Sequence, residues 1–573
     1  MIGLPEATID RPAAITGTNQ AAAGPIRSEN SGRSGLVDSF AKDRLPPGDQ
    51  WPEIDLSHPA YRYPDRLNCV FDFLDKWILN GRGEHSALVT PAGSWTYRRL
   101  FETVNRIGRV LVEDLGLVPG NRVLLRAANT PMMVAAYLAV IKAGGIAVGT
   151  MPLLRASELR KILAKAEISH ALCDLRLRDE LESARAAVPC LRHLVFWQSA
   201  EADGLEARMA AKPASFEPFD SAADDICLIA FTSGTTGEPK GTIHFHRDLL
   251  VICDGFSRQL LRPCADDLFC GSPPLAFTFG LGGLALFPLR EGASSLLLEQ
   301  AAPPQLAEAI ATFRPTICFT APTAWRALAA LADQHDLSSL RKGVSAGEHL
   351  PKATWRLVND KLGLELIDGI GATELLHIFI AAAGPDIRPG ATGRPVPGYQ
   401  ARIVDERGDE VAPGTVGRLA VKGPTGCRYL ADDRQRDYVR GGWNLTGDSF
   451  RMDQDGYFWF HARADDMIIS SGYNIAGPEV ESALLGHPAV AECAVVGKPD
   501  EERGHIVMAF VVPKPGVAAD DALVQALQAH VKQTIAPYKY PRRIEFRERL
   551  PKTATGKLQR FKLRQEAAAA GPT

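Results

Sequence analysis

The chain is 573 residues long, more than one hydrophobic core normally serves, so we expect at least two domains. Its 46% hydrophobic and 23% charged content is typical of a soluble globular protein. With 64 basic and 67 acidic residues the formal net charge is −3, which excludes a general basic surface for nucleic acid or an anionic membrane.

Three further features narrow the class of protein. The ten cysteines are scattered without a C-x-x-C pair, so neither a zinc knuckle nor a redox motif is indicated, and reduced thiols in the cytoplasm are expected. The longest apolar stretch, 132–151, contains Lys142, Gly144 and Gly145 and predicts a core helix followed by a strand. The N-terminus has no basic start before an apolar run, so we expect no secretory signal.

The first part of the chain predicts a tail followed by an α/β domain. Residues 1–47 are rich in Gly, Ala, Ser and Pro, and we expect them to be disordered. Thr96 is placed to cap a helix, and Thr130 with Pro131 to begin another that ends at Gly144. Short apolar strands at 123–125, 146–148, 168–173 and 194–196 alternate with these helical segments. Such alternation predicts a parallel sheet covered by helices.

The apolar run 226–231 predicts a buried strand, and the segment FTSGTTGEPKG at 231–241 follows directly from it. Its glycines can turn backbone N–H groups inward, its hydroxyls add donors and Lys240 adds a charge, a combination that suits a polyphosphate. The spacing differs from the Walker pattern. The predicted phosphate-binding residues are Thr232, Ser233, Gly234, Thr235, Thr236, Gly237 and Lys240.

Further motifs follow along the chain. PPLAFTFGLGG (273–283) places Phe277 and Phe279 on one side if the segment is extended. SAGEHLP (345–351), DGIGATELLHIF (368–379) and WNLTGDSF (443–450) come next. A small C-terminal domain is expected from residue 465 onward, with a helix from Pro478, strands at 490–496 and 506–512 and an amphipathic helix at 521–535. The chain then reaches PKTATGKLQR, which carries Lys557 in a Gly/Thr-rich loop.

Taken together, FTSGTTGEPKG, GATE, TGD, RADDMI and PKTATGK resemble, in this order, the adenylate-forming (AMP-binding) superfamily of acyl- and aryl-CoA synthetases. The resemblance covers residues 49 to 563. It implies a large α/β N-terminal domain (48–464) of parallel-sheet layers plus a small β-barrel, and a small mobile α+β C-terminal domain (465–573). It also implies an acid–thiol ligase with ATP, Mg²⁺ and coenzyme A as cofactor and co-substrates.

The resemblance assigns roles to residues of this chain. Lys557 would be the catalytic lysine that bridges the acid and the α-phosphate, Thr373 would contact that phosphate, and Glu374 would hold Mg²⁺. Asp465 would be the hinge, and Gly472 and Tyr473 would lie on the CoA side. The rest of the ATP site would comprise Gly347, Glu348, Asp368, Gly369, Gly371, Asp448 and Arg463.

The sequences of three motifs resemble those of the benzoate- and 2-aminobenzoate-CoA ligase branch: SPPLAFTFGLGG, SAGEHLP and DGIGATELLHIF. By that resemblance the acid pocket would be lined by Phe277, Thr278, Phe279, Ala346, Gly347, Gly369 and His377. A phenylalanine in the core and a packing role for His377 are the alternatives. Nothing after Lys557 resembles a carrier domain, so coenzyme A is the expected thiol; loading of a separate carrier protein and activation of short or medium fatty acids are the alternatives. The partners are therefore small molecules, and the sequence leaves the oligomeric state open, a homodimer included.

Overall fold

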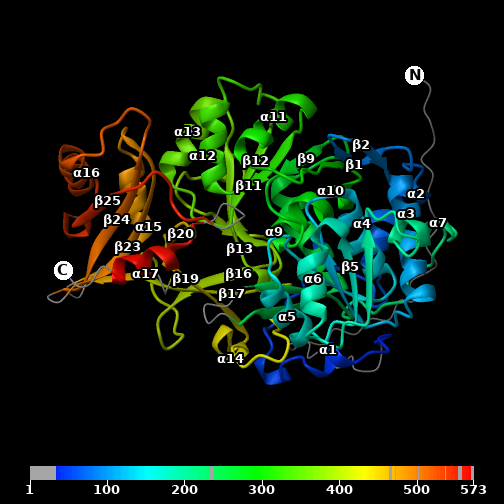
Figure 1. Ribbon diagram of the computed structural model, residues 1–573. Helices are drawn as coiled ribbons and strands as arrows, with labels where there is room; N and C mark the ends of the chain where they lie inside the picture. The colour runs from blue at the N-terminus through cyan, green and yellow to red at the C-terminus, as the bar shows by residue number, and fades with distance from the viewer. Residues whose placement is uncertain are drawn as a thin grey trace, which may run out of the picture. The chain divides into compact units, whose positions relative to one another are not determined.

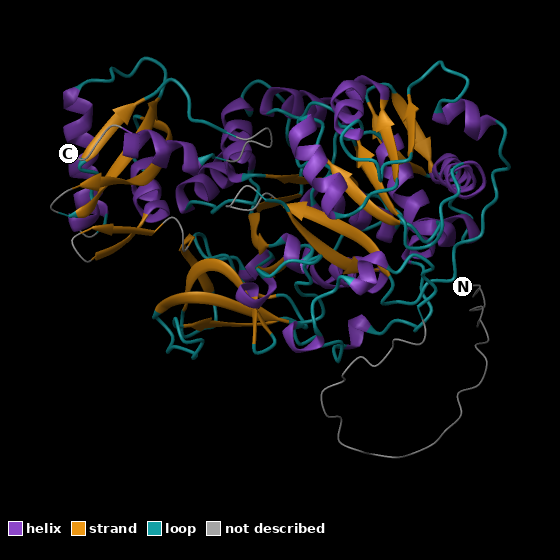
Figure 2. Cartoon of the chain, turned by 60° about the horizontal axis from the view of Figure 1, so that its bottom comes forward, coloured by secondary structure: helices purple, strands orange, loops and turns teal. Residues whose placement is uncertain are grey.

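The computed structural model describes residues 34–232, 238–463, 467–470, 473–500, 503–535, 537–552 and 558–569. Its strands form four sheets, and helices lie along the sheets of the α/β part (Figures 1 and 2). No helix in these ranges has the length and apolar content needed to cross a membrane.

A six-stranded sheet carries the strand that leads into the phosphate loop. Its order is β6-β5-β3-β4-β7-β8, and all neighbours are parallel except the last pair. The strands are β3 (Arg122–Arg126), β4 (Ile146–Thr150), β5 (His170–Asp174), β6 (His193–Trp197), β7 (Ile226–Thr232) and β8 (Lys240–Phe245). The helices of this part are α3 (Tyr97–Arg109), α4 (Pro131–Lys142), α5 (Ala156–Lys165), α6 (Arg178–Arg185), α7 (Leu205–Ala210) and α8 (His246–Ile252).

The sequence signals for α3 and α4 are confirmed in detail. Thr96 accepts a hydrogen bond from the Arg99 N–H at 3.1 Å, and Thr130 accepts one from the Met133 N–H, so both hydroxyls cap their helices. The apolar stripe of α3 is fully buried, and α4 is buried along most of its length. Gly144 follows α4 with φ of +79°, a conformation that suits glycine and ends the helix.

A nine-stranded sheet forms the second layer, in the order β15-β14-β13-β12-β11-β9-β10-β1-β2. Its six central strands are parallel. The strands are β1 (Ser86–Thr90), β2 (Gly93–Thr96), β9 (Leu268–Gly271), β10 (Ser294–Leu296), β11 (Ile317–Thr320), β12 (Lys342–Ala346), β13 (Leu366–Gly371), β14 (Ile378–Ala381) and β15 (Arg394–Pro395). The helices here are α9 (Thr278–Leu281), α10 (Phe287–Glu291), α11 (Pro303–Phe313), α12 (Pro322–Leu331) and α13 (Lys352–Leu362).

The third sheet is antiparallel, with order β16-β17-β19-β18 and β20 paired to β19. Its strands are β16 (Gln400–Val404), β17 (Val416–Lys422), β18 (Val439–Arg440), β19 (Trp443–Met452) and β20 (Phe458–Arg463), and α14 (Gln435–Tyr438) precedes β18. The α/β class is confirmed, but the expected small β-barrel is not, because the pairings within the described residues do not close this sheet.

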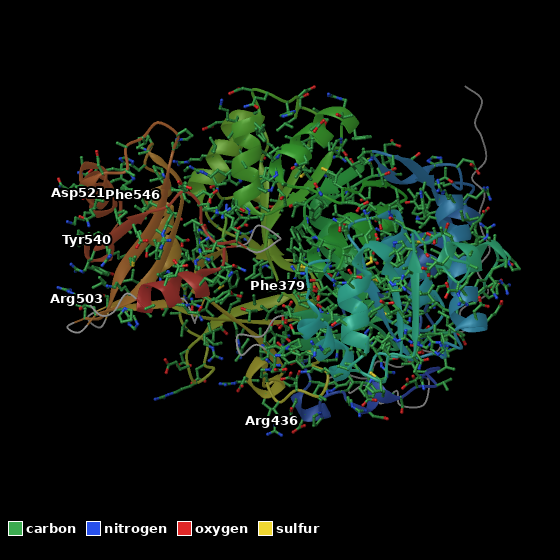
Figure 3. All side chains as sticks on the ribbon, viewed as in Figure 1. Phe379, Arg436, Arg503, Asp521, Tyr540 and Phe546 are labelled. Atoms are coloured by element: carbon green, nitrogen blue, oxygen red, sulfur yellow. The ribbon has the colours of Figure 1, made fainter. Side chains whose placement is uncertain are left out.

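The C-terminal part has its own sheet and core. Strands β21 (Met467–Ser470), β22 (Tyr473–Ala476), β23 (Val490–Asp500), β24 (Gly504–Pro513) and β25 (Arg543–Phe546) pair in one sheet. Helices α15 (Gly477–Leu485), α16 (Asp521–Thr534) and α17 (Arg560–Ala569) accompany it, and Leu523, Leu527 and Val531 of α16 are buried as the pattern predicted. Phe546 and Tyr540, labelled in Figure 3, belong to this part.

The expected disordered tail ends earlier than Pro47. Residues 34–47 belong to the described part and include α1 (Phe40–Asp43), whose Phe40 and Ala41 are buried. Asp38 forms an ion pair with the buried Arg122, and the backbone N–H groups of Val37 and Asp38 donate to the Pro119 carbonyl. The prediction was therefore wrong for 34–47. Four apolar residues anchor this segment to the core although its composition is otherwise largely polar: Leu36, Phe40, Ala41 and Leu45. Residues 1–33 and the boundary at 464/465 lie outside the described residues.

Candidate active site

The two ends of the phosphate loop are held together by a β-hairpin. Strands β7 and β8 are antiparallel, and Thr232 is the register partner of Lys240. Ser233, Gly234, Thr235, Thr236 and Gly237 lie outside the described residues. The hairpin thus fixes the first and last residues of the predicted loop side by side, on strands whose interior is buried.

A tyrosine joins the end of this loop to the predicted magnesium ligand. The Tyr429 hydroxyl donates to Glu374 Oε1 at 2.5 Å and accepts from Lys240 Nζ at 3.4 Å. Lys240 Nζ also lies 5.1 Å from the centroid of the Tyr429 ring. Burial raises the Tyr429 pKa, so the hydroxyl keeps its proton and remains a donor. Sequence reasoning missed Tyr429, which has no motif around it.

Glu374 sits on a short turn, Thr373–Leu375, directly after β13. Because Tyr429 occupies one carboxylate oxygen, the other can serve a hard cation, and such cations prefer oxygen ligands. Tyr429 therefore links Glu374 to Lys240, although the two residues are 134 positions apart in the sequence. Thr373 is the neighbour of Glu374 on the same turn, so three predicted residues belong to this part of the structure.

The TGD motif lies on β19. Asp448 is the register partner of Arg463 on β20, so the two predicted ribose-side residues are neighbours in the sheet. The Asp448 N–H donates to Thr446 Oγ1 at 3.3 Å, which shapes the turn before it. The Arg463 side chain is outside the described part, so its contacts stay a prediction.

The ends of β12 and β13 bring the remaining glycines together. Ala346 is the register partner of Gly369, and Gly347 follows with φ of +90°. A side chain at Gly369 would come within 2.7 Å of Ile378, and one at Gly371 within 2.8 Å of the His377 carbonyl oxygen. Close packing alone therefore requires these glycines, whether or not a substrate ring also approaches them.

Asp368 points to a different environment from its glycine neighbours. Side chains alternate along a strand, and Asp368 lines a small cavity with Trp355, Ala391 and Thr392. Burial raises the pKa of its carboxyl. Its predicted place in the ATP site is thus on the opposite face of β13 from Gly369.

Four phenylalanine rings form an aromatic cage around His377, one of the residues predicted to line the acid pocket. The His377 ring centroid lies 4.6 Å from Phe287, 5.7 Å from Phe279, 5.8 Å from Phe256 and 6.5 Å from Phe319. His377 is 3% exposed, and neither ring nitrogen has a hydrogen-bond partner among the described residues. Burial lowers its pKa to about 3, so the imidazole is neutral at physiological pH.

Residues 278–281 form a helix, so the condition under which Phe277 and Phe279 would share one side of an extended segment is not met. Helix α9 begins at Thr278, and Phe277 is the residue before it. Phe279 packs against the core and lies 5.6 Å from Phe319, which matches the alternative that one phenylalanine is a core residue. Phe277 is half-buried and Thr278 is buried. Phe279 on this helix lies with its ring centroid 5.7 Å from that of His377.

Comparison with known proteins identifies the family. Residues 75–429 match the AMP-binding enzyme family, and residues 479–557 match the AMP-binding enzyme C-terminal domain. The chain belongs to the AMP-binding enzymes. It is 38% identical to a benzoate–CoA ligase of Thauera aromatica over 88% of this chain and 97% of that one. It is 32% identical to a 4-hydroxybenzoate–CoA/benzoate–CoA ligase of Rhodopseudomonas palustris, over 87% and 94% of the two chains.

A solved structure supports the same assignment. The crystal structure of the anthranilate CoA ligase AuaEII in complex with anthranoyl-AMP superposes with a TM-score of 0.85 at 38% identity, covering 89% of this chain and 99% of that one. The predicted family is therefore confirmed. The two matched segments lie on either side of the predicted domain boundary.

The predicted catalytic lysine, Lys557, belongs to the segment of this chain that precedes α17. Lys557 itself is outside the described residues, as are Asp465 and Gly472, and only the backbone of Tyr473 is described. Lys552 and Leu558 pair across the loop, and the Leu558 N–H donates to Glu348 Oε1 at 2.9 Å. The residue next to Lys557 is thus hydrogen-bonded to one of the predicted ATP-site residues.

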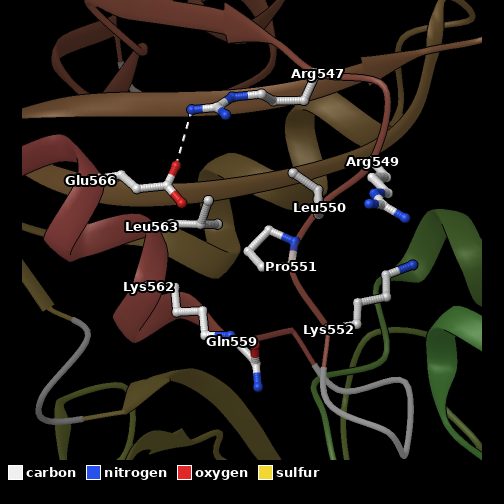
Figure 4. Close-up of a pocket in the computed structure, with 9 residues that line it drawn as sticks. All are labelled: Arg547, Arg549, Leu550, Pro551, Lys552, Gln559, Lys562, Leu563 and Glu566. Atoms are coloured by element: carbon white, nitrogen blue, oxygen red, sulfur yellow. Dashed lines mark hydrogen bonds and ion pairs between the residues drawn. The ribbon is translucent and has the colours of Figure 1, made fainter.

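A pocket of about 530 Å³ lies between the segment 547–552 and α17 (Figure 4). Its lining is Arg547, Arg549, Leu550, Pro551, Lys552, Gln559, Lys562, Leu563 and Glu566, and Arg547 bonds Glu566 at 3.0 Å. None of the predicted ATP- or acid-site residues lines it. The predicted residues Gly347 and Gly371 instead stand at the carboxyl ends of β12 and β13, the edge at which open α/β sheets usually bind ligands.

Proposed function

We propose that this AMP-binding enzyme is an ATP-dependent ligase that joins an aromatic carboxylic acid to coenzyme A. In the first step a carboxylate oxygen attacks the α-phosphorus of ATP, the α–β phosphoanhydride bond breaks, and pyrophosphate leaves. In the second step the CoA thiol loses its proton to solvent, the resulting thiolate attacks the acyl carbon, the bond between that carbon and the phosphate oxygen breaks, and AMP leaves. The balance of both steps needs only the acid, ATP and the thiol.

The observation that carries the aromatic acid is the cage around His377. Four phenylalanine rings surround a neutral imidazole three residues after Glu374. Apolar walls suit a flat ring, because aromatic pairs gain from edge-to-face contact. A neutral imidazole adds one donor and one acceptor for a ring substituent such as an amino group. The similar proteins are named as ligases of benzoate, 4-hydroxybenzoate and anthranilate, which agrees with this choice.

The polar and charged residues of the site would bind ATP and assist the displacement at its α-phosphate. Lys240 and the hairpin loop would neutralise the triphosphate, and Glu374 would hold Mg²⁺, which screens the phosphates when bound. Asp448 would accept from the ribose hydroxyls. Lys557 would approach the α-phosphate from the loop that ends at Leu558, offsetting the charge that builds up during displacement. A cytoplasmic location remains a prediction, supported by ten free cysteines.

The test is acid-dependent thioester formation across a panel of benzoate, 2-aminobenzoate, 4-hydroxybenzoate, phenylacetate and hexanoate, with CoA as acceptor. We expect a benzoate to have the highest kcat/KM. Better turnover of hexanoate would reject the aromatic assignment. Adenylate formation without CoA thioester would instead support the alternative of a carrier-protein acceptor.

A glycine substitution tests the cage itself. A Cβ at Gly282 would collide with the imidazole of His377, so Gly282→Ala should raise the KM for the acid at least several-fold and leave the KM for ATP unchanged. Gly48→Ala is the matched control, because nothing lies within 4 Å of its added Cβ. Equal KM changes for both substrates would place His377 outside the acid pocket.

A further inference from the structure

Three sulfur and nitrogen donors converge in the core beside strand β7. Cys69 lies just before the helical turn Phe71–Asp75, Cys227 is the second residue of β7, and His246 is the first residue of α8. The two cysteines are 0% exposed and His246 is 1% exposed. Their convergence joins three segments that lie far apart in the sequence, and none of the three residues takes part in the proposed ligase chemistry.

The donor atoms have the spacing of a metal site. The Cys69 sulfur lies 3.3 Å from His246 Nδ1, and both sulfurs and the imidazole nitrogen all lie within 4.8 Å of one another. Zinc binds cysteine sulfur at about 2.3 Å and histidine nitrogen at about 2.0 Å, which separates tetrahedral ligands by roughly 3.5–3.8 Å. Side-chain movements of less than about 1 Å would therefore close the three donors on one cation.

The existing hydrogen bonds leave room for such an exchange. His246 Nδ1 faces two donors, the Cys69 N–H at 3.3 Å and the Cys69 thiol, although a neutral ring nitrogen has a single in-plane lone pair. The Cys227 thiol lies 3.8 Å from the His244 carbonyl oxygen, a weak contact. A cation on Nδ1 would replace the two 3.3 Å contacts with Cys69 and the longer thiol contact of Cys227.

The charge balance also suits this buried position. Two thiolates and a neutral imidazole ligand balance Zn²⁺, whereas one thiolate, one thiol and the imidazole balance Cu⁺, so either centre can carry no net charge into the core. With Zn²⁺ the formation is 2 R–SH + Zn²⁺ → (R–S)₂Zn + 2 H⁺, and with Cu⁺ a single proton is released; the protons go to solvent. Thiolate ligands favour Zn²⁺ and Cu⁺ over the hard Mg²⁺ that serves Glu374.

We propose that Cys69, Cys227 and His246 form a binding site for a thiophilic d¹⁰ cation, Zn²⁺ or Cu⁺, separate from the magnesium of the active site. No fourth Cys, His, Asp or Glu atom joins the group within the described residues. Cu⁺ accepts three ligands, and Zn²⁺ would add a solvent oxygen. The cation would link the segment around Cys69 and the start of α8 to β7. Strand β7 ends at Thr232, where the predicted phosphate loop begins.

The first experiment titrates reduced, metal-free full-length protein with Zn²⁺ and, separately, with Cu⁺ under anaerobic conditions against a chromophoric chelator. We expect one equivalent of one of these ions per chain, and Cd²⁺ should give an ultraviolet thiolate charge-transfer band. Cys69→Ser and Cys227→Ser should each weaken binding by 10-fold or more. The double variant Cys270→Ser/Cys318→Ser is the matched control: these cysteines are also buried and face each other on β9 and β11, but no histidine joins them.

Two outcomes would overturn the proposal: no binding by the wild type, or equal binding by the Cys69 and Cys227 variants when circular dichroism shows them folded. If the variants fail to fold, thiol alkylation of the wild type decides. The bound ion should slow labelling of Cys69 and Cys227 more than that of Cys270 and Cys318. Equal slowing of both pairs would show general stabilisation or surface binding, and would also overturn the proposal.

Discussion

At the scale of single residues, the hydroxyl of Tyr429 is the contact that joins the two halves of the phosphate site. It bonds Glu374 and Lys240, which come from the turn after β13 and from the start of β8. The hydrogen bond orients one carboxylate oxygen and therefore the direction in which the other can meet a cation. Tyr429 would thus be a positioning residue for Glu374, acting on the metal through the carboxylate.

Tyr429→Phe should slow acyl-adenylate formation about 10-fold or more. Hydrogen bonds to charged groups contribute about 1.5–3 kcal/mol, and about 1.4 kcal/mol corresponds to a tenfold rate change. We also expect the Mg²⁺ concentration needed for half-maximal pyrophosphate exchange to rise, which a purely structural role would not cause. The measurement is pyrophosphate exchange as a function of Mg²⁺.

Tyr457→Phe provides the control for this substitution. Tyr457 is 3% exposed and its hydroxyl donates to the Asp386 carbonyl at 2.9 Å, so the same atom is removed from a similarly buried ring elsewhere. The Mg²⁺ requirement should not change in this variant. A normal requirement in Tyr429→Phe as well would mean that Glu374 keeps its orientation without the tyrosine.

The site was predictable where a residue belongs to a local motif. Thr232, Lys240, Thr373, Glu374 and Asp448 stand in short local motifs. The structure pairs Thr232 with Lys240 and links Lys240 to Glu374 through Tyr429. Tyr429 was not predictable, because its partners lie 189 and 55 residues away in the sequence and its own neighbours carry no pattern. Long-range contacts of this kind are visible only once the sheets are assembled.

At the scale of secondary-structure elements, local signals decided which predictions succeeded. The helices α3 and α4 each follow a capping threonine, α3 has a periodic apolar face, and α4 ends before Gly144, so both starts and the end of α4 could be predicted. The four-residue helix α9 is too short to show a period, and three of the residues at 280–283 are glycines, so no local pattern predicted this helix. The third sheet could be predicted as β-structure, but its closure depends on pairings that no local pattern encodes.

The segment around α1 should contribute measurably to stability, contrary to its composition. We compare a chain that begins at Ser34 with one that begins at Pro46. The second lacks buried Phe40 and leaves the Arg122 guanidinium, 4% exposed, without Asp38. Burial of one large side chain contributes about 1.5–3 kcal/mol, so the melting temperature of the shorter chain should fall by a few degrees.

Single substitutions separate the contributions within this segment. Phe40→Ala should reproduce a large part of the loss, whereas Val37→Ala should have almost no effect because Val37 is 69% exposed. Differential scanning calorimetry of the purified proteins measures these differences. Equal melting temperatures for the two truncated chains would show that α1 is not anchored in solution.

At the scale of the whole molecule, several histidines are buried in neutral form. Burial lowers the pKa of His170 and of His244 to about 4 and that of His377 to about 3. Their rings are at most 3% exposed, so protonation would place charge in the cores of both α/β sheets. The unfolded chain can protonate the same rings near pH 6.5.

Because of this difference, the free energy of unfolding should decrease as the pH is lowered. These folded-state pKa values are depressed, so the stabilisation is complete above about pH 6.5 and is lost progressively as the pH falls toward 4 to 3. At pH 5 each such histidine would cost about 2 kcal/mol relative to pH 7. Urea denaturation at pH 7 and pH 5 measures the sum. His377→Asn should reduce this pH dependence, whereas His505→Gln, at an exposed position, should not; identical slopes in all three proteins would contradict the argument.

The two half-reactions should be separable by mutation. If Lys557 acts only during displacement at the α-phosphate, Lys557→Ala should slow adenylate formation by about 10²–10³, the usual cost of losing one such electrostatic contact. The same variant should still convert supplied acyl-adenylate and CoA to thioester, because rotation of the C-terminal domain would carry Lys557 away from the site.

Asp465→Pro should do the reverse: proline fixes φ near −65°, which would hold the hinge in one orientation. Pyrophosphate exchange should persist in Asp465→Pro while thioester formation is lost. Equal damage to both half-reactions in both variants would indicate a single fixed active site without domain rotation.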